Sequence, residues 1–197
     1  MKKAVAEGGR KRGRPTGDER AVRREQILDA AIDLFLESGY GGVTLDALAA
    51  QARVTKRTIY AYVGDKAAVF EAVVSRLTLE VLPDGRSDGL EALAIRLVMT
   101  LHSDIAIGLH RMVIAEASQF PELAAGFYAS GPERYMARLS DVIAENMPDS
   151  AATAEQLFAL LLGEPHRRRL LGLESAPTRA RARVLARAAL RSLGLDH

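Results

Sequence analysis

Residues 43–66 read VTLDALAAQARVTKRTIYAYVGDK, which is two short helix-forming stretches joined by only a few residues. Thr44 and Thr55 each precede one of these stretches. Threonine is a favoured N-cap, because its hydroxyl accepts a hydrogen bond from a free backbone N–H group of the first turn. Neither helix is stable alone, since nucleating a helix is costly, but each is stabilised when it packs across the other. The stretch therefore predicts a helix-turn-helix.

The outward side of the second short helix carries cations and a phenol. Arg57, Tyr60 and Ala61 share one side at spacing i, i+3, i+4, and Lys56 stands beside them at the N-terminal end. A helix fits the major groove of duplex DNA, where Lys and Arg donate to guanine and hydroxyl groups donate to phosphate oxygens. Taken singly, these residues also suit solvated charges and ordinary core aromatics. Their joint register predicts a DNA-recognition helix.

The rest of the chain predicts helices throughout. Ala, Leu, Arg and Glu dominate from Arg20 onward, and no segment alternates apolar and polar residues for long. A first helix at about 20–38 ends at Gly39, and a fourth runs over about 65–82. Further helices are expected at about 88–102, 104–118, 121–147, 151–172 and 177–193, with kinks or interruptions at Gly131-Pro132 and Gly163–Pro165. The predicted fold class is all-α, with about nine helices.

The segment from about residue 20 to residue 72 resembles the DNA-binding domain of TetR/AcrR-family transcriptional regulators. Many positions agree in register, and these are Gly41, Gly42, Thr44, Leu48, Ala49, Ala52, Val54, Thr55, Thr58, Ile59, Tyr60, Tyr62, Lys66, Val69 and Phe70. The resemblance implies contacts with DNA phosphates by Thr44, Tyr60, Tyr62 and Lys66. It also implies base-facing positions at Lys56, Arg57 and Thr58, with Thr55 beside them at the helix start.

Two positions depart from the family pattern. Arg53 lies in the turn where the family usually has glycine, and a left-handed backbone there costs another residue about 1 kcal/mol. Val63 replaces the usual phenylalanine, which makes the local core thinner. Neither departure changes the predicted fold, although the turn at Arg53 is expected to differ slightly.

Residues 1–17 are predicted to form a disordered basic arm, because they lack apolar periodicity and are rich in glycine and cations. Residues 10–15 read RKRGRP, and a Gly-Arg-Pro core with flanking cations is narrow and extended. Such a strip suits a DNA minor groove and resembles an AT-hook, with Arg12 and Arg14 as the expected contacts. The alternative is a flexible, solvated tail.

Charge is distributed unevenly along the 197 residues. Residues 1–66 hold 13 Lys and Arg against 9 Asp and Glu, whereas the remainder holds 14 against 16. A basic front and a mildly acidic back indicate that the front meets a polyanion. The longest near-apolar stretches contain charge or histidine, and no apolar segment follows the basic N-terminus, so neither a membrane span nor a signal peptide is expected. We expect a bacterial cytoplasmic protein associated with the nucleoid.

Enzyme chemistry has little support in the sequence. The chain has no cysteine, which excludes disulfides and thiolate metal sites, and common nucleotide-binding, hydrolase and metalloprotease motifs are absent. His102 with Asp104, or His110 with Glu116, could be paired as acid and base, so a helical enzyme using His102 or His110 stays an alternative. We expect no catalytic residue, no metal and no cofactor.

The C-terminal region looks like the AefR-like subgroup of the same family, over 109–139 and 154–173. The resemblance implies a helix-turn-helix domain at 18–66 and a ligand-sensing, dimerising bundle at 67–197. Two apolar stripes in the last helices predict a four-helix interface between two subunits, built from Leu157, Phe158, Leu161, Leu162, Val184, Leu185, Ala188 and Ala189. The alternative is that these stripes face the protein's own core.

An apolar ligand pocket is expected where methionine and aromatic residues meet a few polar side-chain tips. The candidate residues are Met99, His110, Met112, Phe127, Tyr128 and Tyr135. The whole pattern predicts a sequence-specific, homodimeric repressor that binds a palindromic double-stranded operator and responds to an unknown small molecule. A regulator without a ligand, and an activator, remain the alternatives.

Overall fold

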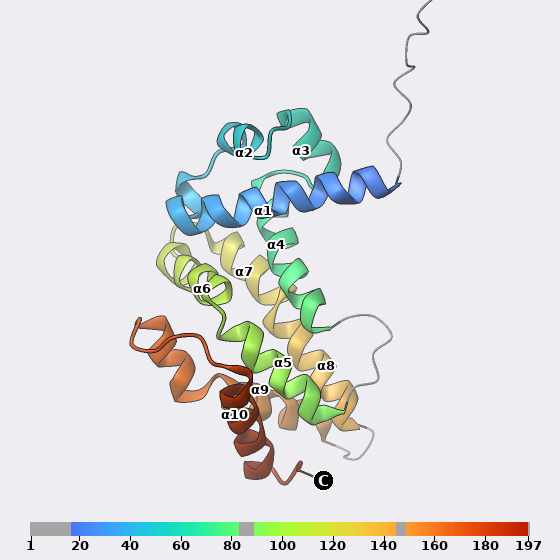
Figure 1. Cartoon of the computed structure of the whole chain (residues 1–197), viewed down its shortest axis with the longest axis vertical. Helices are drawn as coiled ribbons and strands as arrows, with labels where there is room; N and C mark the ends of the chain where they lie inside the picture. Colours follow the sequence, from blue (N-terminus) through green and yellow to red (C-terminus); the bar gives the residue numbers. More distant parts are fainter. Residues whose placement is uncertain (1–16, 83–88, 145–148, 197) are drawn as a thin grey trace, which may run out of the picture.

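The computed structural model describes residues 17–82, 89–144 and 149–196, and these segments form helices without any strand (Figure 1). The helices are α1 (Gly17–Gly42), α2 (Leu45–Gln51), α3 (Lys56–Tyr62), α4 (Lys66–Val81), α5 (Leu90–Leu101), α6 (Asp104–Glu116), α7 (Pro121–Ser130), α8 (Pro132–Ala144), α9 (Ser150–Leu170) and α10 (Arg179–Ser192). The all-α prediction is confirmed. The structure has one more helix in the described ranges than predicted, because Gly131-Pro132 divides the expected helix at 121–147 into α7 and α8.

Local sequence signals account for the helix-turn-helix. Thr44 Oγ1 accepts a hydrogen bond from the Ala47 N–H at 3.1 Å, and Thr55 Oγ1 accepts one from the Thr58 N–H at 3.1 Å. These are the N-caps that the sequence predicted for α2 and α3. Arg53, in the turn between them, has a φ of 53°, so the expected left-handed turn is made by a residue other than glycine.

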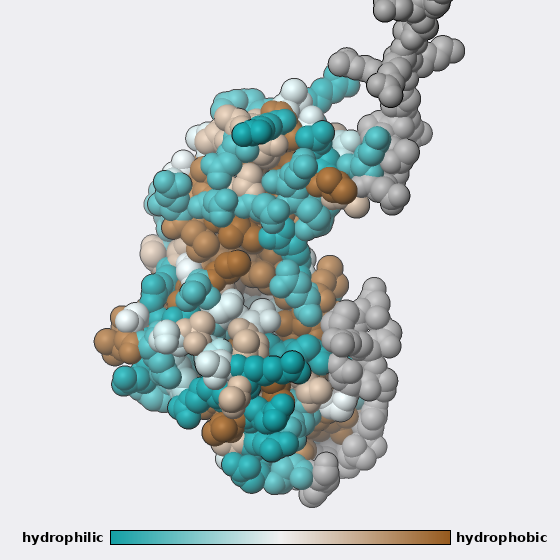
Figure 2. All heavy atoms as spheres, viewed as in Figure 1, coloured by the Kyte–Doolittle hydropathy of each residue, from teal (hydrophilic) through white to brown (hydrophobic). Residues whose placement is uncertain are grey.

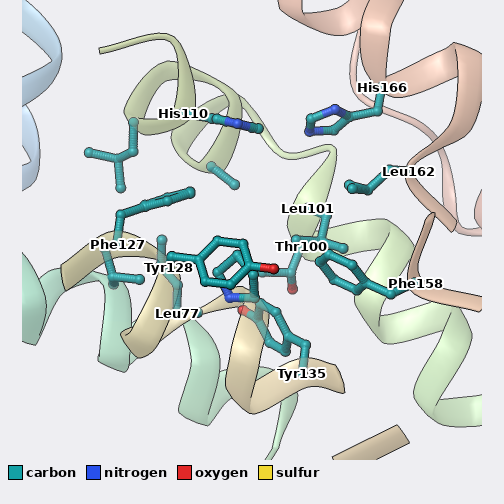
Figure 3. Close-up of a pocket in the computed structure, with 15 residues that line it drawn as sticks. Leu77, Thr100, Leu101, His110, Phe127, Tyr128, Tyr135, Phe158, Leu162 and His166 are labelled. Carbon is teal, nitrogen blue, oxygen red and sulfur yellow. The ribbon is translucent and has the colours of Figure 1, made fainter. Parts of the chain in front are cut away.

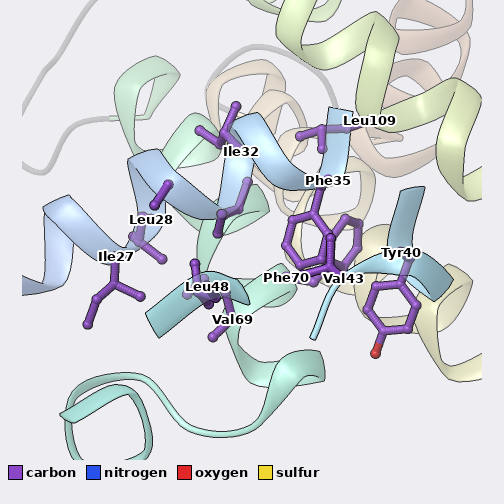
Figure 4. Close-up of a cluster of buried hydrophobic side chains, with 14 of the residues drawn as sticks. Ile27, Leu28, Ile32, Phe35, Tyr40, Val43, Leu48, Val69, Phe70 and Leu109 are labelled. Atoms are coloured by element: carbon purple, nitrogen blue, oxygen red, sulfur yellow. The ribbon is translucent and has the colours of Figure 1, made fainter. Parts of the chain in front are cut away.

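The described helices share two hydrophobic cores, one near each end of the molecule. The first core, which we call the head core, joins α1–α4 to parts of α6 and α7, and Figure 4 shows Phe35 and Phe70 at its centre with Leu109 above them. The second, the tail core, joins the end of α4 to α5, α8, α9 and α10. Helix α4 therefore contributes to both cores.

The head core does not end where the helix-turn-helix ends. Leu109, Met112, Val113 and Leu123 are buried in it beside residues of α1–α4. The polar connection is equally direct, because the Glu116 carboxylate at the end of α6 accepts hydrogen bonds from the backbone N–H groups of Tyr40 at 2.8 Å and Gly41 at 2.6 Å. A division of the chain at residue 66 thus does not coincide with a boundary between cores.

Two glycines bend long helices. Gly39 interrupts α1 with a φ of 70°, and Gly163 interrupts α9 with a φ of 54°. Pro165 follows the second break, as the predicted kink at 163–165 requires. Within the described ranges, no single helix has the length and apolar character to cross a bilayer, and only the bent pair α5–α6 passes that test when its members are joined.

Candidate nucleic-acid interface and ligand cavity

Helix α3 lies at one end of the molecule and presents its charged side to solvent (Figure 1). Arg57 is exposed and makes no hydrogen bond or ion pair with another described residue. The Tyr60 side chain is 58% exposed, which is unusual for a large aromatic residue without a partner. The inward residue Ile59 is completely buried, so packing of Ile59 fixes which side of α3 faces outward. Figure 2 shows hydrophilic side chains over most of this end, with a band of hydrophobic residues below them.

Lys56 is exposed but not free. Its Nζ donates to an Asp46 carboxylate oxygen on α2 at 3.1 Å, and both side chains are more than half exposed. An exposed pair of this kind contributes at most about 1 kcal/mol, so a DNA phosphate or base can replace the Asp46 partner at little cost. The pair holds the Lys56 ammonium over the junction of α2 and α3.

The predicted contacts Thr44, Thr55 and Thr58 all lie on the same end of the molecule. Thr44 and Thr55 are exposed N-caps, and the Thr55 and Thr58 hydroxyl groups are 2.9 Å apart. Hydroxyl groups at helix N-termini stand beside free backbone N–H groups, which together favour an anion such as a phosphate. Arg12 and Arg14 lie outside the described residues.

Tyr62 and Lys66 point partly into the protein. The Arg20 guanidinium lies 5.2 Å from the centre of the Tyr62 ring, which is half-buried against the head core. Lys66 Nζ donates to the Tyr40 carbonyl oxygen at 2.9 Å and lies 4.4 Å from the centre of the Tyr40 ring. Lys66 therefore fixes the start of α4 to the end of α1, and its predicted phosphate contact would use the remaining N–H groups of the ammonium.

The predicted dimer residues need correction. Leu157, Phe158, Leu161 and Ala189 are buried in the tail core of their own protomer, and Leu162 and Leu185 are half-buried against it. Only Val184 and Ala188 are exposed. An apolar stripe on a helix shows that one face is buried but does not show what covers it, and here the covering helices belong to the same chain.

A cavity of about 180 Å³ lies between the head core and the tail core. Its walls come from α4 to α9, and the lining residues are Val74, Leu77, Thr100, Leu101, Ala106, Leu109, His110, Phe127, Tyr128, Gly131, Pro132, Tyr135, Phe158, Leu162 and His166. Figure 3 shows the rings of His110 and His166 on one side, with Tyr128, Tyr135 and Phe158 on the other.

Four of the six predicted pocket residues line this cavity, namely His110, Phe127, Tyr128 and Tyr135. The other two are corrected. Met112 is buried in the head core, and Met99 is exposed and lines an outer groove beside Arg96. His166 also lines the cavity but was not among the predicted pocket residues. Its position after the Gly163–Pro165 break in α9 brings it back over the cavity. Helical spacing alone could not have found it, because the break changes the direction of the side chain.

Three histidines form a cluster beside the cavity. The His166 ring centre lies 5.3 Å from that of His102 and 5.3 Å from that of His110. Burial, followed by the nearby charges of His110, His102 and Arg169, lowers the pKa of His166 to about 4. Burial also lowers the pKa of His110 and of His102. All three imidazoles are therefore neutral near pH 7.

The histidines do not form the acid–base pairs of the enzyme alternative. His102 Nε2 lies 3.0 Å from the Leu161 carbonyl oxygen, and Asp104 forms its ion pair with Arg169. The Glu116 carboxylate binds the backbone at the end of α1 and not His110. Over the described ranges, no three His, Cys, Asp or Glu side chains are arranged to hold a metal ion.

These features define a class of protein: a helix-turn-helix DNA-binding regulator whose reading helix stands on a helical bundle with an internal cavity. The comparisons give the family. The family model of bacterial regulatory proteins of the tetR family matches residues 27–73, and that of the AefR-like transcriptional repressor C-terminal domain matches residues 88–193. The chain belongs to the TetR family and has an AefR-like C-terminal domain. The members of this family are transcriptional regulators, which are not enzymes.

Curated relatives and solved structures agree with this assignment. SrpR from Pseudomonas putida, an HTH-type transcriptional regulator, is 33% identical over 95 residues, which are 46% of this chain and 45% of SrpR. TtgW, another regulator of this type from Pseudomonas putida, is 33% identical over 95 residues, covering 46% of this chain and 71% of TtgW. The chain thus spans about half the length of SrpR.

Two solved structures have a similar backbone over nearly the whole chain. A TetR-family regulator from Mesorhizobium loti superposes with a TM-score of 0.67 at 25% identity, covering 88% of this chain and 95% of that one. The flavonoid-responsive regulator FrrA superposes with a TM-score of 0.67 at 28% identity, covering 87% and 95%.

Proposed function

We propose that this chain is a homodimeric repressor that binds a palindromic operator through α3 and leaves it when a small molecule occupies the cavity. The observation that carries the proposal is the path of α4. Lys66 at its start is bonded to the end of α1, Phe70 is buried in the head core, and Val74 and Leu77 line the cavity. A change in the cavity is therefore transmitted along one helix to the DNA-reading end.

DNA recognition rests on the exposed face of α3. Arg57 and Lys56 can donate to guanine in the major groove, while Tyr60 and the threonine hydroxyl groups of the helix starts bind phosphates. The basic arm with Arg12 and Arg14 would add minor-groove contacts. Such a protein acts on the nucleoid of a bacterial cytoplasm.

The dimer surface that we propose is the outward side of α9 and α10, in place of the buried stripes. Leu160 and Val184 are 45% and 55% exposed, and the small residues Ala159 and Ala188 allow close helix approach. Acidic Glu155 on α9 and the arginines of α10 give complementary charges for a two-fold interface. Two-fold symmetry then presents two copies of α3 to half-sites separated by about one DNA turn or more.

Ligand response follows from differential binding. A ligand that fills the cavity in only one arrangement of α4 favours that arrangement, and it shifts the spacing of the two reading helices. No coupling arises if the ligand binds both arrangements equally.

The test begins with selection of bound duplexes from a random pool by the purified full chain. We expect enrichment of an inverted repeat, and an enriched sequence without symmetry would contradict the dimeric operator. The mass in solution is measured for the wild type and for the double variant Leu160→Glu with Val184→Glu. We expect dimer and monomer respectively, and a variant that stays dimeric would show that the interface lies elsewhere. The control variant Ala137→Glu places a single added glutamate at an exposed position of α8.

A further inference from the structure

The lining of the cavity is almost purely apolar. None of its described lining residues is Asp, Glu, Lys or Arg. Burying a charged ligand group in an apolar site without a charged partner is strongly unfavourable. The cavity therefore discriminates against carboxylates and amines.

The size and shape of the cavity favour a flat ring. An apolar cavity of about 150 Å³ binds benzene, and this one has about 180 Å³. Aromatic side chains form its walls, with the His110 and Phe127 ring centres 5.4 Å apart on one side and those of Tyr135 and Phe158 6.3 Å apart on another. Rings of a ligand can stack against or meet the edges of these side chains (Figure 3).

Polar recognition is available from two neighbouring imidazoles, besides the hydroxyl groups of Thr100 and Tyr128. The ring nitrogens of His110 and His166 have no hydrogen-bond partner among the described residues, although both rings lie at the cavity. The Tyr135 side chain, by contrast, is buried, and Thr78 lies beside its hydroxyl group. A neutral imidazole offers one N–H donor and one acceptor nitrogen, and a hydroxyl group is the smallest group that can use both.

We infer that the effector is an uncharged phenol-type molecule of one or two rings, with its hydroxyl group hydrogen-bonded to His166 and its ring between Phe127, Tyr128 and Phe158. This inference rests on the proposed function, since it identifies the ligand class of the same cavity. A hydroxyl group left in the apolar part would lose its bonds to water, so the two histidines fix the orientation of the ring.

The experiment compares three probes that share an ethyl-substituted benzene ring, with the full-length protein at pH 7.5. The probes are 4-ethylphenol, ethylbenzene and 4-ethylbenzoate, and binding is measured by calorimetry or by ligand NMR. We expect 4-ethylphenol to bind and 4-ethylbenzoate to bind about 100-fold more weakly. In His166→Phe, which keeps an aromatic ring, 4-ethylphenol should bind about ten-fold more weakly than in the wild type, while ethylbenzene changes by less than about two-fold.

Ethylbenzene serves as the control for an intact cavity, and His166→Gln restores part of the hydrogen bonding. Absence of 4-ethylphenol binding, equal losses for both neutral probes, or tighter binding of the benzoate would each overturn the inference. Release of the selected operator by 4-ethylphenol is scored separately. A probe that binds with the expected His166 dependence but leaves the operator complex intact would contradict ligand-responsive repression and leave the ligand class standing.

Discussion

The two cores of the molecule are built from different side chains. The head core contains an aromatic group in which Tyr40 meets Phe35, Phe70 and Phe120, with ring centres 5.2–5.9 Å apart. The tail core is mostly leucine and alanine, with one aromatic pair at the cavity. Edge-to-face ring contacts restrict relative orientation, whereas aliphatic contacts allow small shifts of packed helices. The difference indicates that the head core holds α3 rigidly, whereas the tail core can adapt its helix packing.

The difference between the two cores is tested most strongly by removing α5–α10, which form most of the tail core and of the cavity. The fragment 1–82 keeps α1–α4 but loses the α6 and α7 residues that complete the head core. We expect the fragment not to fold. Exposing the apolar surface that α6 and α7 cover would cost more free energy than the small net stability of such a domain. Circular dichroism during thermal unfolding checks this. A cooperative transition of the fragment would show that the head core is self-sufficient.

A smaller effect is expected from the polar link between the two regions. Glu116→Ala removes two charge-assisted hydrogen bonds to the end of α1, and partial exposure of the site limits the loss to about 2–3 kcal/mol. Chemical denaturation measures the free energy of unfolding. Glu37→Ala, an exposed glutamate on α1, is the matched control. Equal stability of the two variants would mean that the link contributes nothing.

Arg57→Ala tests the reading surface while leaving both cores intact. We expect a loss of about 1–3 kcal/mol in operator affinity and a relaxed base preference, with unchanged unfolding. Affinity is measured by fluorescence anisotropy on the selected operator and on single-base variants. Exposed Arg167 on α9, changed to alanine, controls for overall charge. An unaltered preference profile would show that Arg57 does not read bases.

The smallest effect concerns pH. The folded pKa of His166 lies near 4, below the ordinary 6.5, so the unfolded state binds the proton more tightly. The contribution of His166 to the free energy of unfolding is therefore fully present above pH 6.5 and is lost as the pH falls toward 4. His102, His110 and Arg169 surround the ring and oppose its protonation. Between pH 7 and pH 5, we expect the free energy of unfolding to fall by about 1–2 kcal/mol less in His166→Phe than in the wild type. Denaturation experiments at both pH values measure this difference. Parallel losses in both proteins would assign the pH response to other groups.

Sequence reasoning succeeded where the signal is local. The caps Thr44 and Thr55, the turn at Arg53 and the break at Gly131-Pro132 each depend on a few neighbouring residues. The outward side of α3 could also be predicted, because Ile59 at helical spacing defines the inward side.

Features that depend on distant contacts could not be predicted. The hydrogen bonds from the end of α1 to Glu116 join residues up to 76 positions apart, and no local sequence pattern predicts them. The stripe containing Leu157 and Leu161 was expected at a subunit interface, because the sequence does not say which helix will cover an apolar face. The side chain of Met112 is of a type that suits a ligand pocket, but its position on α6 directs it toward the head core.

Gly39 has a consequence for how related chains can diverge. A side chain at this position would place its Cβ 2.5 Å from the Glu116 Oε1 atom, in a backbone conformation that disfavours it in any case. Substitutions at 39 and 116 are therefore tied together. Among descendants of a common ancestor, we expect glycine at the first site to be retained wherever the acid is retained at the second.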